Sequence, residues 1–416
     1  MDQTVQEILT FIEEQDVKFI RLAFCDLDGR QKNISVMPKQ IERVFQDGIL
    51  FDGSAIQGFT PIQQSDLILL PDPSTMDILP WRPQTGRVLR FFCTICYPDK
   101  TPYEHDMRSL FKQQLKQIKQ QGYRVWSGME CEFYLFHRNE DGTCNWIPHD
   151  QASYFDVAPK DKGEDVRRDI CLTLEEMGIE PESSHHEQGP GQNEIDFHFA
   201  QAITSCDHMV TFQWAVEMIA EQHHLIASFQ AKPLKQESGS GLHINLSLSK
   251  HYQNAFQLED HTLLHYFVEG MLSRIKEITL FLNPELNSYE RFGTYGAPKY
   301  LSWSYANRSA LIRIPKVSQE YVRCEVRSAD PQCNPYIATM LLLAAGMEGI
   351  REQKAIREEC RENLQEAAIE LESLPLSLQE AITYAKQSSF VASVLPCSVI
   401  DYYVESRMRM LHEQQG

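Results

Sequence analysis

The sequence of 416 residues predicts an α+β protein with two domains, a small β-rich domain at residues 1–104 and a larger one at 105–416. Two observations indicate this division. Strand-like apolar runs joined by turns dominate the first part of the chain, at residues 17–36, 67–70 and 86–97. Helical apolar spacing then alternates with further strands over residues 106–121, 205–229, 261–281 and 335–367. A chain of this length is long enough to bury a large core.

The first elements follow from simple spacing and turn rules. Val5, Ile8, Leu9 and Ile12 recur at helical spacing, so a short amphipathic helix opens the chain. The run VKFIRLAFCDLDGRQKNISVMP predicts two strands joined at residues 26–29, where Asp-Gly is a hairpin signal. In the helix at 106–121, Asp106 is the candidate N-cap and Gly122 the stop signal.

Charge and composition exclude several classes of function. The chain has 39 Lys and Arg against 58 Asp and Glu, which gives a formal net charge of −19 without any basic block. We therefore expect no nucleic-acid partner and no anionic membrane surface. No apolar run approaches the ~20 residues of a membrane span. The 11 cysteines are an odd number spread along the chain, which is typical of reduced thiols in a cytoplasmic protein.

Four segments of the second domain alternate between apolar and polar residues with the two-residue period of a strand. They are GMECEFYLF, QNEIDFHFA, GSGLHINLSLS and YVRCEVRS. The polar positions share one face within each strand: Glu130 and Glu132; Gln192, Glu194 and Asp196; His243, Asn245 and Ser247; Arg323, Glu325 and Arg327. Each strand therefore has one packed face and one face of ligand-type side chains.

Any one of these strands could also belong to an antiparallel sheet with one face in water. Here, however, the polar faces carry Glu, His, Asn and Arg rather than the Lys, Thr and Ser of a solvated face. Clustered carboxylates repel one another unless cations neutralise them. Oxygen ligands with one imidazole suit Mg²⁺ or Mn²⁺. Glu187, seven residues before Glu194 in HHEQGPGQNE, can reach the same place from a loop.

Arginines form the second signal. Five of them fall between residues 291 and 327 of an otherwise acidic protein: Arg291, Arg308, Arg313, Arg323 and Arg327. The guanidinium group of an arginine binds a phosphate or a carboxylate through two hydrogen bonds. Each of these arginines could instead pair with a structural carboxylate. Glutamate-rich strands and an arginine group in one domain suggest metal-assisted phosphoryl transfer from a nucleotide. The motifs of P-loop and Rossmann sites are absent from the sequence.

Ordered motifs over nearly the whole chain resemble bacterial class I glutamine synthetase. They are FDGSAIQGF, GMECEF, HHEQGPGQNE, KPLKQESGSGLHINLSL, NPELNSYERFG, NRSALIRIP and RCEVRSADPQCNPY. The resemblance implies a β-grasp-like N-terminal domain and a catalytic domain of antiparallel strands, an open barrel flanked by helices. It also implies ATP-dependent formation of glutamine from glutamate and ammonia through γ-glutamyl phosphate, in a dodecamer of two hexameric rings.

The resemblance assigns roles residue by residue. Two Mg²⁺ or Mn²⁺ ions per active site would be held by Glu132, Glu187 and Glu194, and by Glu130, His243 and Glu325. Arg308 and Arg323 would stabilise the transferring phosphoryl group. Glutamate would be bound by Ser238, Gly239, Arg291, Arg308 and Arg327. The nucleotide would contact Glu182, Phe199, Asn245, Ser247, Arg313 and Arg323.

The ammonium pocket implied by the resemblance is shared between subunits. Asp52 in FDGSA would accept a proton from ammonium and would be contributed by the neighbouring subunit, so that only an oligomer is active. Tyr154 in SYFDV and Glu187 would complete the pocket. Taken alone, Asp52 would be interpreted as a turn residue.

One position departs from the family pattern. The family's flap usually carries Glu directly before Ala-Pro, and this chain has Gly296 there, in GTYGAPKY. Losing this carboxylate removes a general base, which is typically worth ~10²–10⁴ in rate. Three hypotheses stay open: glutamine synthetase with Asp52 as the base, a γ-glutamyl amine ligase whose Gly296 admits an organic amine, and an inactive regulatory ring.

Overall fold

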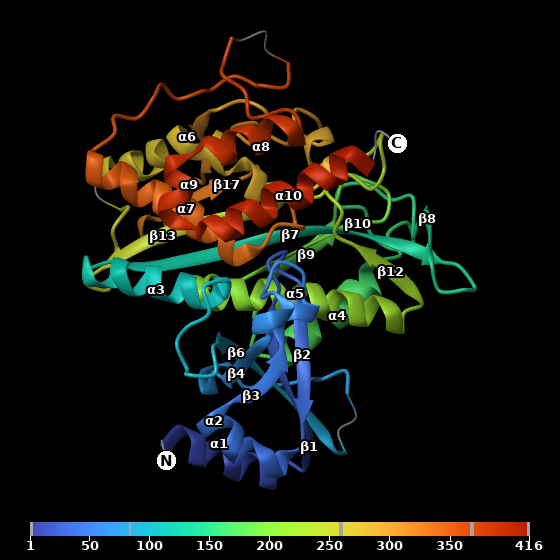
Figure 1. Cartoon of the computed structure of the whole chain (residues 1–416). Coiled ribbons are helices and arrows are strands. Elements are labelled where there is room, and N and C mark those ends of the chain that lie inside the picture. Colours follow the sequence, from blue (N-terminus) through green and yellow to red (C-terminus); the bar gives the residue numbers. More distant parts are fainter. Residues whose placement is uncertain (1–2, 83–84, 258–260, 367–369, 414–416) are drawn as a thin grey trace. The chain divides into compact units, whose positions relative to one another are not determined.

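The computed structural model describes residues 3–82, 85–257, 261–366 and 370–413, which fold as two compact units (Figure 1). The first unit comprises Met1–Gln113 and Leu172–Ile179. The second comprises Gln114–Cys171 and Glu180–Gly416. Among the described residues, no helix is both long enough and apolar enough to cross a membrane. The expected α+β class is confirmed, while the division at residue 104 stays a prediction.

The first unit is built on a sheet that, within the described residues, has six strands in the order β2-β1-β6-β4-β3, with β5 paired to β6. The strands are β1 (Val17–Cys25), β2 (Gln31–Val36), β3 (Ile49–Asp52), β4 (Asp66–Pro71), β5 (Asp77–Ile78) and β6 (Arg87–Cys96). Strands β1 and β6 run parallel, and the other pairs are antiparallel. The expected hairpin at residues 17–36 is confirmed, and the Asp26 carboxylate accepts a hydrogen bond from the Arg30 N–H in its turn.

Three helices complete the first part of the chain: α1 (Gln3–Glu14), α2 (Ile41–Asp47) and α3 (Met107–Gln120). The expected opening helix is therefore confirmed. The expected cap of α3 is confirmed too, because the Asp106 carboxylate accepts a hydrogen bond from the Ser109 N–H at 3.2 Å.

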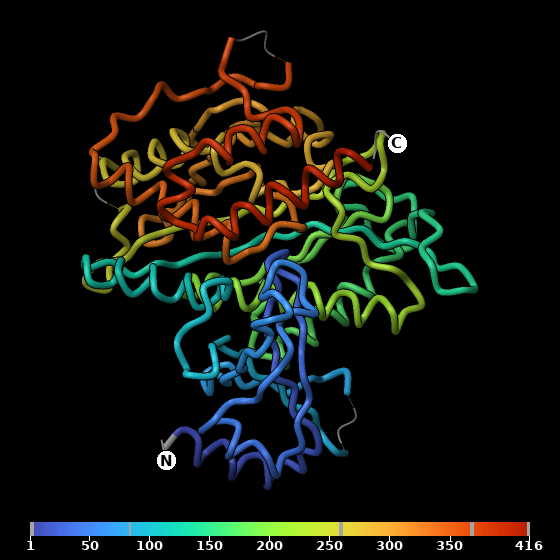
Figure 2. The backbone as a smooth tube through the Cα atoms, viewed as in Figure 1, coloured from blue at the N-terminus to red at the C-terminus, as the bar shows by residue number. Residues whose placement is uncertain are grey.

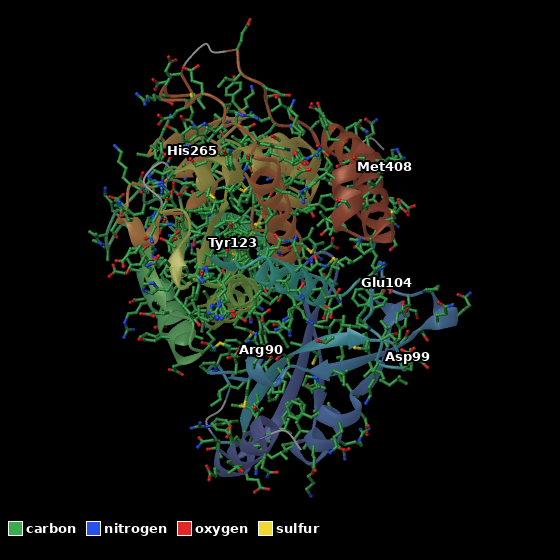
Figure 3. The ribbon with its side chains drawn as sticks, turned by 90° about the vertical axis from the view of Figure 1, so that its left-hand side faces the viewer. Arg90, Asp99, Glu104, Tyr123, His265 and Met408 are labelled. Atoms are coloured by element: carbon green, nitrogen blue, oxygen red, sulfur yellow. The ribbon has the colours of Figure 1, made fainter. Side chains whose placement is uncertain are left out.

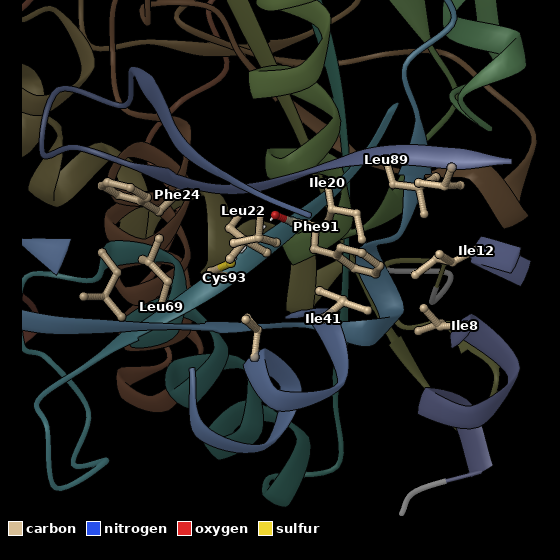
Figure 4. Packing of buried hydrophobic residues seen from close by; sticks show 14 of the residues in the cluster. Ile8, Ile12, Ile20, Leu22, Phe24, Ile41, Leu69, Leu89, Phe91 and Cys93 are labelled. Carbon is tan, nitrogen blue, oxygen red and sulfur yellow. Dashed lines mark hydrogen bonds between the residues drawn. The ribbon is translucent and has the colours of Figure 1, made fainter. Parts of the chain in front are cut away.

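The core of the first unit lies between the sheet and helices α1 and α2 (Figure 4). Alternate residues of β1, Ile20 and Leu22, are fully buried, as are Leu89 and Phe91 of β6. Ile41 of α2 packs into the same cluster. The residues that β1 and β6 contribute to this cluster alternate with the two-residue period of a strand, while β6 is buried on its other face as well, at Arg90 and Phe92.

The second unit contains a sheet that, in the described part of the chain, has eleven strands. Seven follow the path β15-β16-β17-β13-β7-β10-β9, β8, β11 and β12 also pair with β7, and β14 pairs with β13. Its strands are β7 (Arg124–Arg138), β8 (Cys144–Pro148), β9 (Pro181–His186), β10 (Gln192–Phe197), β11 (Ala200–Gln201), β12 (Leu225–Ser228), β13 (Leu242–Lys250), β14 (Gln253–Asn254), β15 (Trp303–Tyr305), β16 (Ile312–Ile314) and β17 (Cys324–Val326). The long strand β7 lies at the centre, between β13 and β10. Because β15 and β16 pair in parallel, the sheet is mixed rather than wholly antiparallel as expected.

Helix α5 (Ala202–Gln222) packs against β7, as Figure 1 shows. The Phe212 ring contacts Phe133 of β7 and Phe197 of β10, with ring centroids 6.1 and 5.7 Å apart. The helix was expected to continue to residue 229, and that expectation is wrong. His224 takes a left-handed conformation with φ of 59°, and the chain then pairs with β7 as β12.

The later helices gather into one layer (Figure 2). They are α6 (Thr262–Leu282), α7 (Pro335–Glu352), α8 (Leu378–Gln387), α9 (Ser389–Val394) and α10 (Cys397–Glu413); earlier in the chain, α4 (Glu164–Glu176) precedes β9. The helix expected at 335–367 ends at Glu352, because Gln353 is left-handed with φ of 51°. His265 of α6, labelled in Figure 3, lies 2.9 Å from the Tyr305 hydroxyl and so connects this layer to β15.

Helices α6 and α7 approach each other through glycines. A Cβ on Gly270 would collide with the Ala345 carbonyl oxygen and lie 2.8 Å from the Gly349 Cα atom. Gly346 has the same role opposite the Phe267 ring. The close crossing therefore requires residues without side chains.

We predict that Gly270→Ala lowers the free energy of unfolding by about 1–3 kcal/mol, because the added methyl forces the two helices apart. Chemical denaturation of the whole protein measures the change. Ser273→Ala on the same helix removes only a local hydrogen bond to the Glu269 carbonyl and should cost less. Equal stability of Gly270→Ala and the unmodified chain would contradict the crossing described above.

Candidate active site

The carboxylates predicted to share a face lie side by side on the central strands. In the register of β7 and β10, Glu132 is opposite Glu194 and Glu130 is opposite Asp196. The alternate residues Met129, Cys131 and Phe133 are all buried on the other face, as expected. The sheet therefore brings four acidic side chains from two adjacent strands into one place.

A first cluster joins three strands. His243 of β13 is opposite Glu130 of β7, and its Nδ1 atom lies 3.1 Å from a Glu130 carboxylate oxygen and 3.9 Å from one of Glu325 in β17. One ligand atom from each of the three residues fits within a 4.8 Å group. Glu325 is fully buried and pairs with two arginines, Arg313 at 2.5 Å and Arg327 at 2.6 Å.

A second cluster contains Glu187 and Glu194. The His185 Nε2 atom lies 3.2 Å from a Glu187 carboxylate oxygen and 3.3 Å from one of Glu194. Glu132 is opposite Glu194, but one of its oxygens accepts hydrogen bonds from the Gly241 N–H at 2.9 Å and the Gln192 amide at 3.1 Å. The structure thus brings the three predicted carboxylates into one region and adds His185.

The sequence did not lead us to predict His185 as part of the site. It placed Asp196 on the polar face of its strand but not among the cation ligands. Glu130, Glu194 and Asp196 form a third group that connects the first two clusters. The signal for His185 was its spacing, because it lies two residues before Glu187 in HHE and so has the same side-chain parity.

Burial and mutual repulsion perturb the acidity of these groups. Burial and the nearby Glu187 charge raise the pKa of Glu132 to about 7. Burial and the charges of Asp196 and Glu132 raise the pKa of Glu194 as well. Burial alone would also raise the pKa of Glu130, but hydrogen bonds from His243 and Asn245 lower it to about 2.

The ionised forms of Glu132 and Glu194 are therefore disfavoured, first by burial and then by the neighbouring carboxylates. A donor set of carboxylate oxygens with imidazole nitrogens fits a hard divalent cation such as Mg²⁺ or Mn²⁺. A bound cation would favour the ionised carboxylates and remove their repulsion. The side chains of these clusters therefore fit the divalent cations that the sequence predicts.

The arginines predicted to bind glutamate and phosphate take different positions. Arg291 is 2% exposed and donates to the carbonyl oxygens of Ser328 and Ala329. A Cβ on Gly239 would lie 2.7 Å from the Arg291 Cγ atom, so this close approach needs glycine. Ser238 is buried beside it, and Arg308 is exposed in the segment between β15 and β16.

A cavity of about 960 Å³ opens next to the first cluster. Its lining contains five of the six residues predicted to contact a nucleotide: Glu182, Phe199, Asn245, Ser247 and Arg323. The sixth, Arg313, is not in the lining and pairs with Glu325 instead. Glu130 lines the cavity too, so that it reaches from the metal-type ligands to the Phe199 ring.

Sequence reasoning missed the aromatic walls of this cavity. Trp126 and Tyr321 meet the Phe199 ring edge-on, with ring centroids 5.8 and 6.5 Å away, and Tyr252 also lines the space. Trp126 lies on β7 with the same parity as Glu130 and Glu132. That parity was the available signal, and Tyr321 likewise has the parity of Arg323 and Glu325 in YVRCEVRS, whereas nothing local marked Tyr252.

The residues predicted to form the ammonium pocket lie in both units. Asp52 belongs to the first unit and is exposed, and hydrogen bonds from the Ser54 hydroxyl and N–H lower its pKa. Tyr154 belongs to the second unit, is 45% exposed, and its ring meets that of His185 edge-on at 5.6 Å. Glu187 lies in the second cluster, next to His185.

Gly296 is in an open loop with φ of +83°, and a Cβ at this position would meet no other atom within 4 Å. Glycine adopts this conformation freely, whereas a glutamate there would be strained. The neighbouring Tyr295 hydroxyl donates to the Gln236 carbonyl at 2.7 Å and so holds the loop against the segment that precedes Ser238.

The fold and the site together indicate a class of protein, namely an enzyme in which a mixed sheet holds a carboxylate-rich centre beside an aromatic-lined cavity. Models of two domains match the chain: the glutamine synthetase β-grasp domain over residues 16–98 and the glutamine synthetase catalytic domain over residues 104–415. The chain belongs to the glutamine synthetase family. Membership implies an ATP-dependent ligase that uses a divalent metal.

Similar proteins span almost the whole chain. The glutamine synthetase of Clostridium saccharobutylicum is 41% identical over 97% of this chain and 94% of its own length, and that of Methanosarcina mazei 42% identical over 96% and 92%. A solved structure titled GmaS in complex with ADP has a TM-score of 0.89 at 25% identity, covering 98% of this chain and 96% of that one. Plasmodium falciparum glutamine synthetase has the same fold, with a TM-score of 0.88 at 21% identity, over 100% of this chain and 97% of that one. The curated relatives do not favour the amine-ligase alternative.

The raised pKa of Glu132 predicts pH-dependent metal affinity. A carboxyl with pKa about 7 must release its proton to bind a cation, so Mn²⁺ affinity should rise about tenfold from pH 6 to pH 8. Titration calorimetry at pH 6 in two buffers of different ionisation enthalpy should detect the released proton. Glu132→Gln should bind Mn²⁺ more weakly and with a smaller pH dependence. An equal Mn²⁺ affinity at pH 6 and pH 8 would contradict a raised pKa of Glu132 at the metal site.

Proposed function

We propose that the protein is a class I glutamine synthetase, which joins glutamate to ammonia with hydrolysis of ATP through γ-glutamyl phosphate. One observation carries the proposal. The cavity lined by the Phe199 ring also reaches Glu130 of the carboxylate clusters. A nucleotide whose base lies against the aromatic residues would therefore extend its phosphates towards the metal-type ligands.

Two divalent cations, Mg²⁺ or Mn²⁺, would be held by Glu130, His243 and Glu325, and by Glu132, Glu187 and Glu194. His185 contacts two members of the second set and is able to orient them. Bound cations would screen the charge of the ATP phosphates while the phosphoryl group transfers. The ion pairs of Glu325 with Arg313 and Arg327 fix one carboxylate in place beforehand.

Arginines would stabilise the negative charges of the phosphoryl group and of glutamate. Arg323 lines the nucleotide cavity, and we assign it, with Arg308, to stabilising the transferring phosphoryl group. Arg291 and Arg327 would bind the carboxylates of glutamate, beside Ser238 and Gly239. The γ-carboxylate of glutamate attacks the γ-phosphorus of ATP, the bond to ADP breaks, and an acyl phosphate forms.

Ammonia then displaces phosphate from the acyl phosphate. Asp52 would take a proton from ammonium, and Tyr154 and Glu187 would line its pocket. The lowered pKa of Asp52 keeps this carboxylate ionised and able to bind the cation. We propose that Asp52 comes from the neighbouring subunit, in a dodecamer of two hexameric rings. All eleven cysteines are free thiols, which fits an enzyme of the cytoplasm.

The direct test of the function measures phosphate release from ATP with Mg²⁺, glutamate and ammonium. Release that requires both glutamate and ammonium supports the proposal. Faster release with a small organic amine than with ammonium would make the protein an amine ligase instead. Binding of ATP and metal without turnover would favour a regulatory ring.

Sharing of the active site predicts complementation between inactive variants. Asp52→Ala should lose ammonium-dependent turnover and Arg327→Ala should lose glutamate binding. Mixed oligomers of the two should recover activity, because some interfaces then combine an intact Asp52 with an intact Arg327. Native mass spectrometry confirms the mixing, and each variant mixed with itself is the control. Demonstrably mixed oligomers without any recovery would contradict the shared site.

A further inference from the structure

A buried hydrogen-bond network lies behind the loop that carries Glu187. From it we infer that Asp150 and His186 are positioning residues that fix the Glu187 loop and the Tyr154 segment relative to each other. The inference rests on the proposed function, because these two segments supply Glu187 and Tyr154 to the ammonium pocket. Asp150 is 4% exposed and His186 is 1% exposed, and neither belongs to the clusters that face the proposed metals.

Asp150 connects both segments through a single carboxylate. One oxygen lies 3.0 Å from His186 Nε2 and accepts the Gly191 N–H at 2.9 Å, so it reaches both ends of the loop at 187–191. The same oxygen accepts the Ala152 N–H, and the other oxygen accepts the Lys162 N–H. Those two donors flank the segment that carries Tyr154. The carboxylate is therefore the point at which the two segments meet.

His186 provides the second connection. Its Nδ1 atom lies 2.6 Å from the Glu187 carbonyl oxygen, and its own carbonyl oxygen accepts the Phe155 N–H at 3.1 Å. The Phe155 ring stacks on Tyr154 with centroids 4.0 Å apart. Adjacent histidines thus serve opposite sides of the strand, since His185 contacts the carboxylates and His186 holds the backbone behind them.

A neighbouring ion pair supports the same loop. Arg167 pairs with Asp161 and donates to the Asn193 side-chain oxygen at 2.6 Å, and the Asn193 amide donates to the Gly191 carbonyl at 2.9 Å. Asp150, Asp161 and His186 lie close enough to hold a cation. However, the Asp150 oxygens already accept four donors and Asp161 pairs with Arg167, so these residues act as a hydrogen-bonded support.

Such a network is sensitive to the loss of one member. Removing a partner leaves buried donors or acceptors unsatisfied, and the segments then shift until water or new partners satisfy them. A shift of the loop displaces Glu187 and Tyr154. The aromatic lining of the nucleotide cavity has no member in this network, so nucleotide binding should be unaffected.

The test compares His186→Phe, which keeps a ring but removes both nitrogens, with His186→Gln, which keeps a donor able to reach Asp150. The Phe variant should raise the KM for ammonium and weaken Mn²⁺ binding by ~10–100-fold, as loss of outer-shell partners typically does. Its KM for ATP, measured at saturating metal, should not change. The Gln variant should recover part of both losses, and Asp150→Asn should resemble the Phe variant.

Glu348→Gln is the matched control. It disrupts a partly buried ion pair with Arg274 in the helical layer of the same unit, and it should leave the KM for ammonium and the Mn²⁺ affinity unchanged. The inference would be overturned if His186→Phe kept the wild-type KM for ammonium and the wild-type Mn²⁺ affinity. It would also be overturned if His186→Phe and Glu348→Gln changed the KM for ammonium, the KM for ATP and the Mn²⁺ affinity equally. If His186→Phe fails to fold, His186→Gln and Asp150→Asn carry the same comparison.

The two proposals fail in different ways. If the unmodified protein shows no ammonium-dependent turnover, the proposed function is wrong. Mn²⁺ affinity, which requires no turnover, still reports whether Asp150 and His186 position the Glu187 loop. Unchanged Mn²⁺ affinity in all three variants, in a protein that does make glutamine with an unchanged KM for ammonium, would overturn the positioning role alone.

Discussion

Mutual repulsion among buried carboxylates is the constraint on which the structure of the second unit depends. Glu130, Glu132, Glu194 and Asp196 share one face of two adjacent strands, where burial makes their negative charges costly. The protein neutralises part of this charge with its own groups, the arginines at Glu325 and the imidazoles of His185 and His243. Burial and the neighbouring negative charges raise the pKa values of Glu132 and Glu194, and a bound cation would offset both effects.

The fold meets this constraint by fixing the carboxylates from behind. The opposite face of β7 and β10 is an apolar layer, in which Phe133 and Phe197 pack on Phe212 of α5. That packing sets the register and therefore the spacing between Glu132 and Glu194. Glu187 is carried by a loop instead of a strand, and there the hydrogen bonds of Asp150 and His186 hold the backbone, as the sheet does elsewhere.

The sequence predicted which strand faces carry the carboxylates better than it predicted the ends of helices. A strict two-residue period identified the faces that carry Glu130, Glu194 and His243, because a one-residue error would bury every carboxylate in the apolar layer. It could not show that β12 follows α5 or that α7 ends at Glu352, since left-handed residues such as His224 and Gln353 terminate these helices without a local signal. It also missed Tyr252, whose place in the cavity lining depends on contacts between distant segments, and it overlooked His185, which its spacing from Glu187 could have revealed.

Crystals grown with Mn²⁺ test the central claim most directly, because anomalous scattering locates the ion without any assumption about activity. The account predicts two peaks in each subunit, one among Glu130, His243 and Glu325 and one among Glu132, Glu187 and Glu194. If no anomalous peak lay beside well-ordered carboxylates at a saturating Mn²⁺ concentration, the account would be contradicted. The clusters would then balance their charge by protonation rather than by binding metal.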